Sequence, residues 1–363
     1  MQVFSAEEKI YIWLDSFPLD EQEKRRLLKE AEEPKTLLKK LPEIFPKAVK
    51  TGKESVYKNM LASLSDDGAY FQGVLSAFEK RGVTPLPYPA KNYPKALKEL
   101  SAPPLVLYLK GNVALLEQEL FCVIGSRVTP EQTMKIGKQI AKDLSGGFTL
   151  VTGSADGGDS CAVEGALLGS GKVVCVLAGG FSSLPKSNLP LFKKVLEKGL
   201  IVATHPEFAP VRAFSYEKRN EILATLSCGT LVISAGEKSG TLITAKYAKK
   251  QRKPVFALPY PPENPYGKGC NALIKDGAFL TETANDIFLK TGKKTTSERA
   301  EKPTLSGNEK LVYEILQKEN EANLSLLSEQ TGIPAYLLAG TVTSLEVKGL
   351  IVKTGGNHIA IIK

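Results

Sequence analysis

The chain contains the stretch FCVIGSRVTPEQTMKIGKQIAKDLSGGFTLVTGS at residues 121–154. Two short apolar runs, 121–124 and 149–152, each end in a glycine followed by a hydroxyl residue, with a helix-compatible segment between them. A strand that passes through a glycine turn into a helix directs backbone N–H groups at one point, which favours an anion such as phosphate. Two such units in neighbouring parallel strands predict one ligand site at the carboxyl edge of a sheet.

Strand-like and helix-like segments continue to alternate up to residue 290. Short Val/Ile/Leu runs separated by helical stretches indicate a parallel sheet covered by helices on both faces. We expect strands at 121–125, 149–153, 172–178, 200–204, 229–234, 254–258 and 278–281. We expect helices near 131–145, 158–170, 187–198, 217–226, 240–251, 270–276 and 284–290. The predicted fold class is therefore α/β, with a Rossmann-like parallel-sheet domain at 85–290.

Two smaller domains are predicted on either side of this sheet. Residues 1–84 indicate several short helices, as in a SAM or helix-hairpin-helix domain, a protein-docking module or a purely stabilising extension. Residues 291–305 contain few apolar residues and predict a linker. Residues 306–363 indicate three helices and a hairpin, which is the pattern of a winged helix. Its third helix has no Lys or Arg at 335–345, which favours protein contact or dimerisation over groove reading.

Composition narrows the class of partner and the location. The formal net charge of +9 favours a polyanion, with nucleic acid as the leading candidate and a merely basic protein as the alternative. No apolar run reaches the ~18 residues that a membrane span needs, and the first residues lack the pattern of a signal peptide. We therefore expect a cytoplasmic protein that has no membrane partner.

Several kinds of catalytic and cofactor site are disfavoured. The five cysteines form no C-x-x-C pair and there are only two histidines, so neither a metal site, a disulfide framework nor a Ser-His-Asp triad is predicted. The first turn has one glycine where a dinucleotide fingerprint needs G-x-G-x-x-G, which disfavours NAD. Gly171-Lys172 lacks the other residues of a phosphate-binding P-loop. We expect no cofactor.

The candidate site consists of three glycine turns, which begin at Gly125, Gly153 and Gly236, and of one helix start at 218–220. The third turn follows the strand at 229–234, and the helix start lies beside Phe214 and Tyr216, where a base could stack on a ring. Isolated Lys and Arg residues on a surface usually do nothing specific, but next to the glycine turns we expect them to bind a nucleic-acid backbone. The predicted binding residues are Gly125, Ser126, Arg127, Gly153, Ser154, Lys218, Arg219, Asn220, Ser239, Gly240 and Thr241.

Sequence blocks within 85–285 resemble the DNA-processing protein A family (DprA, also Smf). These blocks occur in the family's order, at 103–112, 123–127, 152–159, 218–220, 238–245, 264–265 and 269–274. The resemblance implies a bacterial cytoplasmic protein that is not an enzyme, usually forms a homodimer and binds single-stranded DNA. It also implies that the protein protects this DNA and loads RecA recombinase onto it in natural transformation or recombination. Within the predicted set, the resemblance assigns DNA contact to Ser126, Arg127, Gly153, Ser154, Lys218, Arg219 and Asn220. It implies that Ser239, Gly240 and Thr241 line the same pocket.

The chain departs from the family pattern at two places. Asp156 stands where a basic residue is usual, and Tyr216-Glu217 stands where Phe-Pro is usual. Both changes add negative charge near the expected phosphate path, which predicts weaker binding or a shifted path. One alternative function is an enzyme similar to a nucleotide phosphoribohydrolase, with Glu237 or Asp156 as its carboxylate. Another is a scaffold whose flanking domains recruit partners.

Overall fold

The structure is a computed structural model that describes residues 3–207, 211, 213–293, 305–354 and 358–361. The chain divides into two compact units, Met1–Thr295 and Thr296–Lys363. Most of the predicted linker, 294–304, lies outside the described residues. Within those residues, no helix is both long enough and apolar enough to cross a bilayer.

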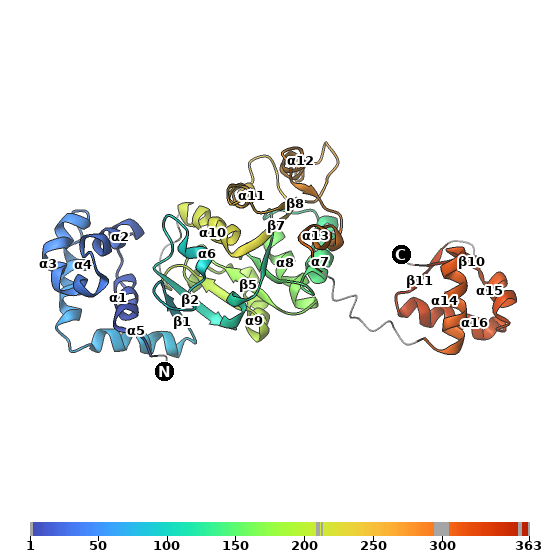
Figure 1. Cartoon of the computed structure of the whole chain (residues 1–363), viewed down its shortest axis with the longest axis horizontal. Coiled ribbons are helices and arrows are strands. Elements are labelled where there is room, and N and C mark those ends of the chain that lie inside the picture. Colours follow the sequence, from blue (N-terminus) through green and yellow to red (C-terminus); the bar gives the residue numbers. More distant parts are fainter. Residues whose placement is uncertain (1–2, 208–210, 212, 294–304, 355–357, 362–363) are drawn as a thin grey trace. The chain divides into compact units, whose positions relative to one another are not determined.

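A nine-stranded sheet forms the centre of the first unit (Figure 1). Its strands are β1 (Thr84–Pro87), β2 (Val106–Gly111), β3 (Leu120–Gly125), β4 (Thr149–Thr152), β5 (Val173–Val176), β6 (Leu200–Ala203), β7 (Ser227–Ser234), β8 (Val255–Ala257) and β9 (Phe279–Leu280). They lie in the order β1-β2-β6-β5-β4-β3-β7-β8-β9. The prediction of a parallel sheet is confirmed for β3 to β9.

One edge of the sheet differs from the prediction. β1 pairs antiparallel with β2, and β2 pairs antiparallel with β6. Pro85 and Pro87 have no N–H to donate to a second neighbour, so β1 can only be an edge strand. The sheet is therefore mostly parallel, with an antiparallel edge.

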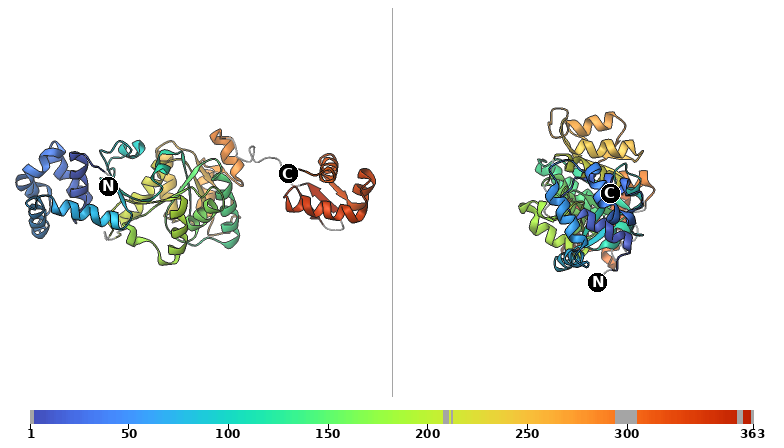
Figure 2. Two further views of the ribbon diagram at one scale, coloured as in Figure 1. Left: turned by 90° about the horizontal axis from the view of Figure 1, so that it is seen from below. Right: turned by 90° about the vertical axis from the view of Figure 1, so that its left-hand side faces the viewer.

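Helices cover both faces of this sheet (Figures 1 and 2). One face is covered by α7 (Glu131–Leu144), α8 (Gly158–Leu168), α9 (Leu189–Lys198) and α13 (Ala284–Thr291). The other face is covered by α6 (Lys95–Lys98), α10 (Ala213–Leu226), α11 (Thr241–Lys250) and α12 (Lys268–Lys275). Successive strand residues point to opposite faces. In β3, Phe121 and Val123 therefore join the first core, whereas Cys122 and Ile124 join the second.

Five helices precede the sheet, and their core is continuous with the first core of the sheet. They are α1 (Ala6–Asp15), α2 (Glu21–Glu30), α3 (Leu37–Ala48), α4 (Glu54–Leu64) and α5 (Ala69–Lys80). A 3-10 turn, η1 (Pro34–Thr36), lies between α2 and α3. Three more 3-10 turns follow among the described residues: η2 (Val113–Glu117), η3 (Phe181–Ser183) and η4 (Lys186–Asn188). Ser5 and Asp20 form capping boxes that satisfy the first N–H groups of α1 and α2.

A buried polar cluster joins these helices to the sheet. The Lys24 Nζ donates to an Asp15 carboxylate oxygen at 2.7 Å, and the Tyr108 hydroxyl of β2 donates to the other oxygen at 2.6 Å. All three side chains are buried. Burial and the adjacent Asp15 carboxylate both raise the pKa of the Tyr108 phenol, so Tyr108 remains a protonated donor.

Among its described residues, the second unit contains three helices and a small sheet. The helices are α14 (Gly307–Glu319), α15 (Leu324–Thr331) and α16 (Ala335–Val347), and the strands are β10 (Glu321–Asn323), β11 (Ile351–Thr354) and β12 (His358–Ile361). The three helices and the β11–β12 pairing were predicted, whereas β10, which pairs with β12, was not. Ten buried apolar residues contributed by all of these elements form its separate core.

Glu309 in α14 gives the second unit an acid sensitivity. Its carboxylate accepts hydrogen bonds from Lys348, Ser344 and the Ser306 N–H, which lower the pKa of Glu309 to about 2 from an ordinary 4.5. A lowered pKa in the folded state means that this stabilisation is complete above about pH 4.5 and is lost as the pH falls towards 2. We expect hydrogen exchange in 305–354 of the full chain to accelerate over that range.

Two variants test the origin of this sensitivity. Glu309→Gln is expected to make exchange faster at neutral pH and to flatten its acid dependence. Glu319→Gln changes an exposed residue on the same helix and is the matched control, which should retain the wild-type profile. An unchanged acid profile in Glu309→Gln would contradict the assignment.

Candidate functional site

The site lies where the order of the parallel strands reverses. From β3 the chain continues to β4, β5 and β6 on one side, and returns to β7, β8 and β9 on the other. The backbone N–H of Ser126, just after β3, donates to the carbonyl of Ser234 at the end of β7, at 3.0 Å. Open α/β sheets bind ligands outside the carboxyl ends of their strands at such a point.

Three glycines allow the first two turns to touch. A Cβ on Gly125 would lie 2.9 Å from the Cα of Gly158, and a Cβ on Gly158 would clash with the backbone of Gly125. Gly157 has φ +77° and would place a Cβ against the carbonyl oxygens of Ser126 and Arg127. The N–H of Gly158 donates to the Ser126 carbonyl at 3.0 Å, which fixes the two turns together. Only glycine combines this φ with such close backbone approach.

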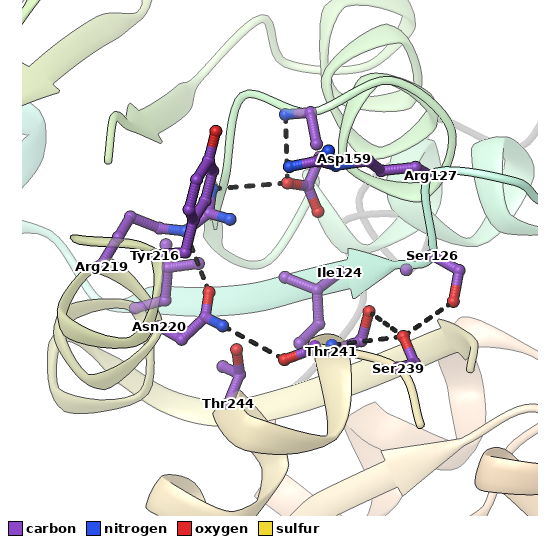
Figure 3. Close-up of a pocket in the computed structure, with 14 residues that line it drawn as sticks. Ile124, Ser126, Arg127, Asp159, Tyr216, Arg219, Asn220, Ser239, Thr241 and Thr244 are labelled. Atoms are coloured by element: carbon purple, nitrogen blue, oxygen red, sulfur yellow. Dashed lines mark hydrogen bonds and ion pairs between the residues drawn. The ribbon is translucent and has the colours of Figure 1, made fainter. Parts of the chain in front are cut away.

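A chain of hydroxyl groups links the first turn to the third. The Ser126 and Ser239 Oγ atoms are 2.9 Å apart, and the Ser239 Oγ lies 3.0 Å from the Thr241 Oγ1 (Figure 3). Thr241 is the first residue of α11, where unpaired backbone N–H groups create a partial positive charge. Because hydroxyl groups can rotate to donate, these side chains can turn their hydrogens towards a bound oxyanion.

Arg219 and Asp159 form a buried ion pair beneath the cavity (Figure 3). The Arg219 Nη1 lies 3.5 Å from the Asp159 Oδ2, and the Arg219 Nε donates to the Asn220 Oδ1 at 3.0 Å. Burial raises the pKa of the Asp159 carboxyl, and Arg219 opposes that rise. A Cβ on Gly153 would clash with both members of the pair, so glycine makes room for it.

Arg127 carries an exposed positive charge at the same edge. Its guanidinium carbon lies 5.4 Å from the centroid of the Tyr216 ring, within the range of a cation–π contact. Tyr216 is 41% exposed as a residue and lines the cavities at this edge, so it is accessible to a ligand. Figure 3 shows both side chains on the opposite side of the pocket from the hydroxyl chain.

Two adjacent cavities occupy this edge, with volumes of about 250 and 260 Å³. The residues that line both are Arg127, Ala155, Tyr216 and Arg219. The first cavity continues towards the third turn, and the second towards Ser154, Asp156 and Ser183. A chain-like ligand could therefore occupy both cavities with successive units.

The structure brings together most, though not all, of the predicted site residues. The first cavity is lined by Gly125, Ser126, Arg127, Arg219, Asn220, Ser239, Gly240 and Thr241. Ser154 lines the second cavity, and Gly153 lies behind Arg219. Lys218 lines neither cavity: its ammonium donates to the carbonyl of Ala102 and lies 3.8 Å from Glu221, and burial lowers its pKa.

Sequence reasoning gave no role to Asp159 and missed Thr244 and Leu223, which also line the first cavity. Residues 216, 219, 220 and 223 follow the i, i+3, i+4, i+7 spacing and so share one face of α10. This signal was available in the sequence. In the described part of the chain, no group of three or more His, Cys, Asp or Glu residues could hold a metal ion.

Glycine turns, hydroxyls and arginines that converge at the switch point of an open α/β sheet define a Rossmann-like ligand-binding protein. The chain belongs to the DNA recombination-mediator protein A family, whose sequence model matches residues 85–292. This family takes part in DNA processing and recombination.

Individual relatives support this assignment. The DNA processing protein DprA of Bacillus subtilis is 33% identical over 218 residues, covering 59% of this chain and 73% of the relative. Protein Smf of Escherichia coli is 29% identical over 285 residues and covers 76% of each chain. The crystal structure of DprA from Streptococcus pneumoniae superposes with a TM-score of 0.65 at 27% identity, covering 80% of this chain and 99% of that one.

A further solved structure concerns the single-stranded DNA binding mode of DprA from Helicobacter pylori. It superposes with a TM-score of 0.53 at 26% identity and covers 58% of this chain and 97% of that one.

Proposed function

We propose that the protein binds single-stranded DNA at the switch-point cavities, protects it and loads RecA recombinase onto it during natural transformation or recombination. The observation that carries the DNA-binding part is the convergence of three anion-binding turns with Arg127 and Arg219 at one sheet edge. The single-stranded DNA binding described for the Helicobacter pylori relative supports the same choice of ligand. RecA loading, a homodimer and a cytoplasmic location complete the proposal and rest on the family resemblance.

The distribution of charge supports a polyanionic ligand at this domain. Residues 85–290 contain 25 Lys and Arg against 17 Asp and Glu, whereas residues 1–84 contain 14 of each. Residues 306–363 contain 5 Lys and Arg against 6 Asp and Glu. Almost all of the net charge of +9 therefore belongs to the sheet domain, where it attracts phosphates and makes binding dependent on salt.

The geometry suggests how a single strand would be held. A phosphate in the first cavity would accept hydrogen bonds from the Ser126, Ser239 and Thr241 hydroxyls at the N-terminus of α11. Arg127 would neutralise a second phosphate, and a base would stack on Tyr216. Stacking requires a base that is not paired within a duplex, so single strands are expected to bind more tightly than duplexes.

The carboxylates suit this function better than nucleotide hydrolysis. Glu237 lies 3.7 Å from Lys268 and lines neither cavity. Asp159 is paired with Arg219, and Asp156 lines only the second cavity. A phosphoribohydrolase-like mechanism needs a carboxylate directed at the bound nucleotide, and no specific contact favours that alternative.

The flanking segments receive supporting roles in the proposal. We propose that residues 1–84 form a SAM-like or helix-hairpin-helix-like domain, 85–290 the DNA-binding domain, 291–305 a linker and 306–363 a winged helix. In α16, Tyr336 and Val347 are 78% and 83% exposed, and the helix has no Lys or Arg. That surface suits contact with protein better than contact with a phosphate backbone.

Fluorescence anisotropy of a labelled oligothymidylate and its duplex, over a salt series, tests the DNA-binding part. Arg127→Ala is expected to weaken single-strand binding about tenfold, because a charge-assisted contact is lost. It is also expected to reduce the slope of log affinity against log salt by about 0.7, because one phosphate contact is removed.

Lys218→Ala removes the same charge and is the matched control. Because the Lys218 ammonium is bonded to Ala102 and pairs with Glu221, we expect less than about a twofold change in affinity. Equal losses of affinity in the two variants would indicate that the bound strand also contacts Lys218. Equal affinity for single strand and duplex would contradict the proposed function.

A further inference from the structure

We propose that the second cavity receives one base of the bound strand, and that Asp156 makes this cavity prefer guanine to thymine. The inference rests on the proposed function, because it assumes that the ligand is a single strand of DNA. Asp156 then selects the base, whereas the sequence alone suggested that it repels phosphate or serves as the carboxylate of a hydrolase.

The second cavity has the walls of a base-binding pocket. Ala178, Pro185 and Val211 supply apolar lining, and Tyr216 supplies an aromatic ring. Ser154, Ser183 and Asp156 supply polar groups. Flat apolar walls with a few polar groups are the usual environment of an unstacked base that is recognised through its edge.

The cavity is placed for a neighbouring unit of the same strand. It shares Arg127 and Tyr216 with the first cavity, whose hydroxyl chain and helix N-terminus suit a phosphate. In Figure 3 these two side chains lie across the pocket from Ser239 and Thr241. A strand that fixes a phosphate at the hydroxyls can therefore pass Tyr216 and place a base beyond it.

The Asp156 carboxylate is held in position by its surroundings. The Ser187 hydroxyl donates to the Asp156 Oδ1 at 2.9 Å, and the Asn188 side chain donates to the neighbouring Ser154 carbonyl at 3.5 Å. Within the described residues, Asp156 forms no ion pair and its Oδ2 accepts no hydrogen bond. The Oδ1 can accept a second bond as well, since each carboxylate oxygen has two lone pairs.

The chemistry of the base edges then favours guanine. Guanine presents two adjacent donors, N1–H and the N2 amino group, which match the two oxygens of a carboxylate. Thymine presents one N3–H between two carbonyl oxygens, so its carbonyls face the negative charge. A bidentate contact between a side chain and a base discriminates against the other bases, and for an exposed carboxylate we expect about a five- to tenfold preference.

Competition anisotropy with the full chain tests this inference. The probes are strands of about 12 nucleotides: all-thymine, the same strand with separated guanines, and one with hypoxanthine in place of each guanine. Wild type is expected to bind the guanine strand about five- to tenfold more tightly than the thymine strand. Hypoxanthine lacks the N2 amino group, so its strand is expected to have an intermediate affinity.

Asp156→Asn identifies the residue responsible. It is expected to abolish the guanine preference while binding all-thymine DNA at least as tightly as wild type, because a negative charge is removed. Glu237→Gln is the matched control, since this carboxylate lines neither cavity, and it should retain the preference. Equal affinities of wild type for the guanine and thymine strands would contradict this inference but not the proposed function. A guanine preference that survives in Asp156→Asn would do the same. If none of the strands bound, both this inference and the proposed function would be contradicted.

Discussion

Gly158→Ala is expected to destabilise the first unit by about 3 kcal/mol and to weaken single-strand binding by about tenfold or more. The new Cβ would clash with the backbone of Gly125, so α8 and β3 would have to separate. Separation would break the hydrogen bond from the Gly158 N–H to the Ser126 carbonyl and would displace the first glycine turn. Urea denaturation followed through Trp13, together with anisotropy, measures both effects.

Gly240→Ala is the matched control for this substitution. Gly240 also lines the first cavity, but it has φ −59° and no atom within 4 Å of an added Cβ. We expect its stability to remain within about 0.5 kcal/mol of wild type. If both variants unfolded at the same urea concentration as wild type, the contact between the two turns would not be required for the fold.

Asp15→Ala is expected to destabilise the first unit by about 3–5 kcal/mol. Lys24 is 5% exposed, and its ammonium would lose its carboxylate partner and keep only the Asp15 backbone carbonyl as an acceptor. The substitution would also remove the acceptor of the Tyr108 hydroxyl. The cost arises mainly from this unpaired buried charge, because its hydration cannot be recovered inside the core. Urea denaturation checks the value.

Lys40→Ala provides the comparison with an exposed pair. Lys40 and Glu32 are 2.9 Å apart, close to the 2.7 Å of Lys24 and Asp15, but the Glu32 side chain is 79% exposed. An exposed pair contributes about 0–1 kcal/mol, so this variant should be nearly as stable as wild type. Similar losses for Asp15→Ala and Lys40→Ala would contradict the importance of burial.

The sheet could be predicted because its signals are local. Each predicted strand from 121 to 281 is a short apolar run, and each glycine turn follows its strand directly in the sequence. Parallel strands place their carboxyl ends at one edge, so the meeting of the three turns followed from the strand directions. The ends of the strands moved by only a few residues in the structure.

The remaining features depend on partners that are distant in sequence. Asp159 pairs with the buried Arg219, and Asp15 pairs with the buried Lys24. No pattern around either aspartate in the sequence indicates this pairing. The direction of Lys218 was missed because residues 218–220 were interpreted together as a helix start, whereas α10 begins at Ala213 and they lie inside it. Along this longer helix, Lys218 and Glu221 lie on a different face from Tyr216 and Arg219.

The position of β3 also determines when this strand gains its second neighbour during synthesis on the ribosome. Leu120 of β3 pairs with Thr149 of β4, but on its other side it pairs with Ser227 of β7. Synthesis proceeds at roughly 5–20 residues per second, so the interval between the synthesis of β3 and that of β7 is on the order of 5–20 s. The strand that carries the first glycine turn is interior in the finished sheet, yet it has an open apolar edge until β7 has been synthesised.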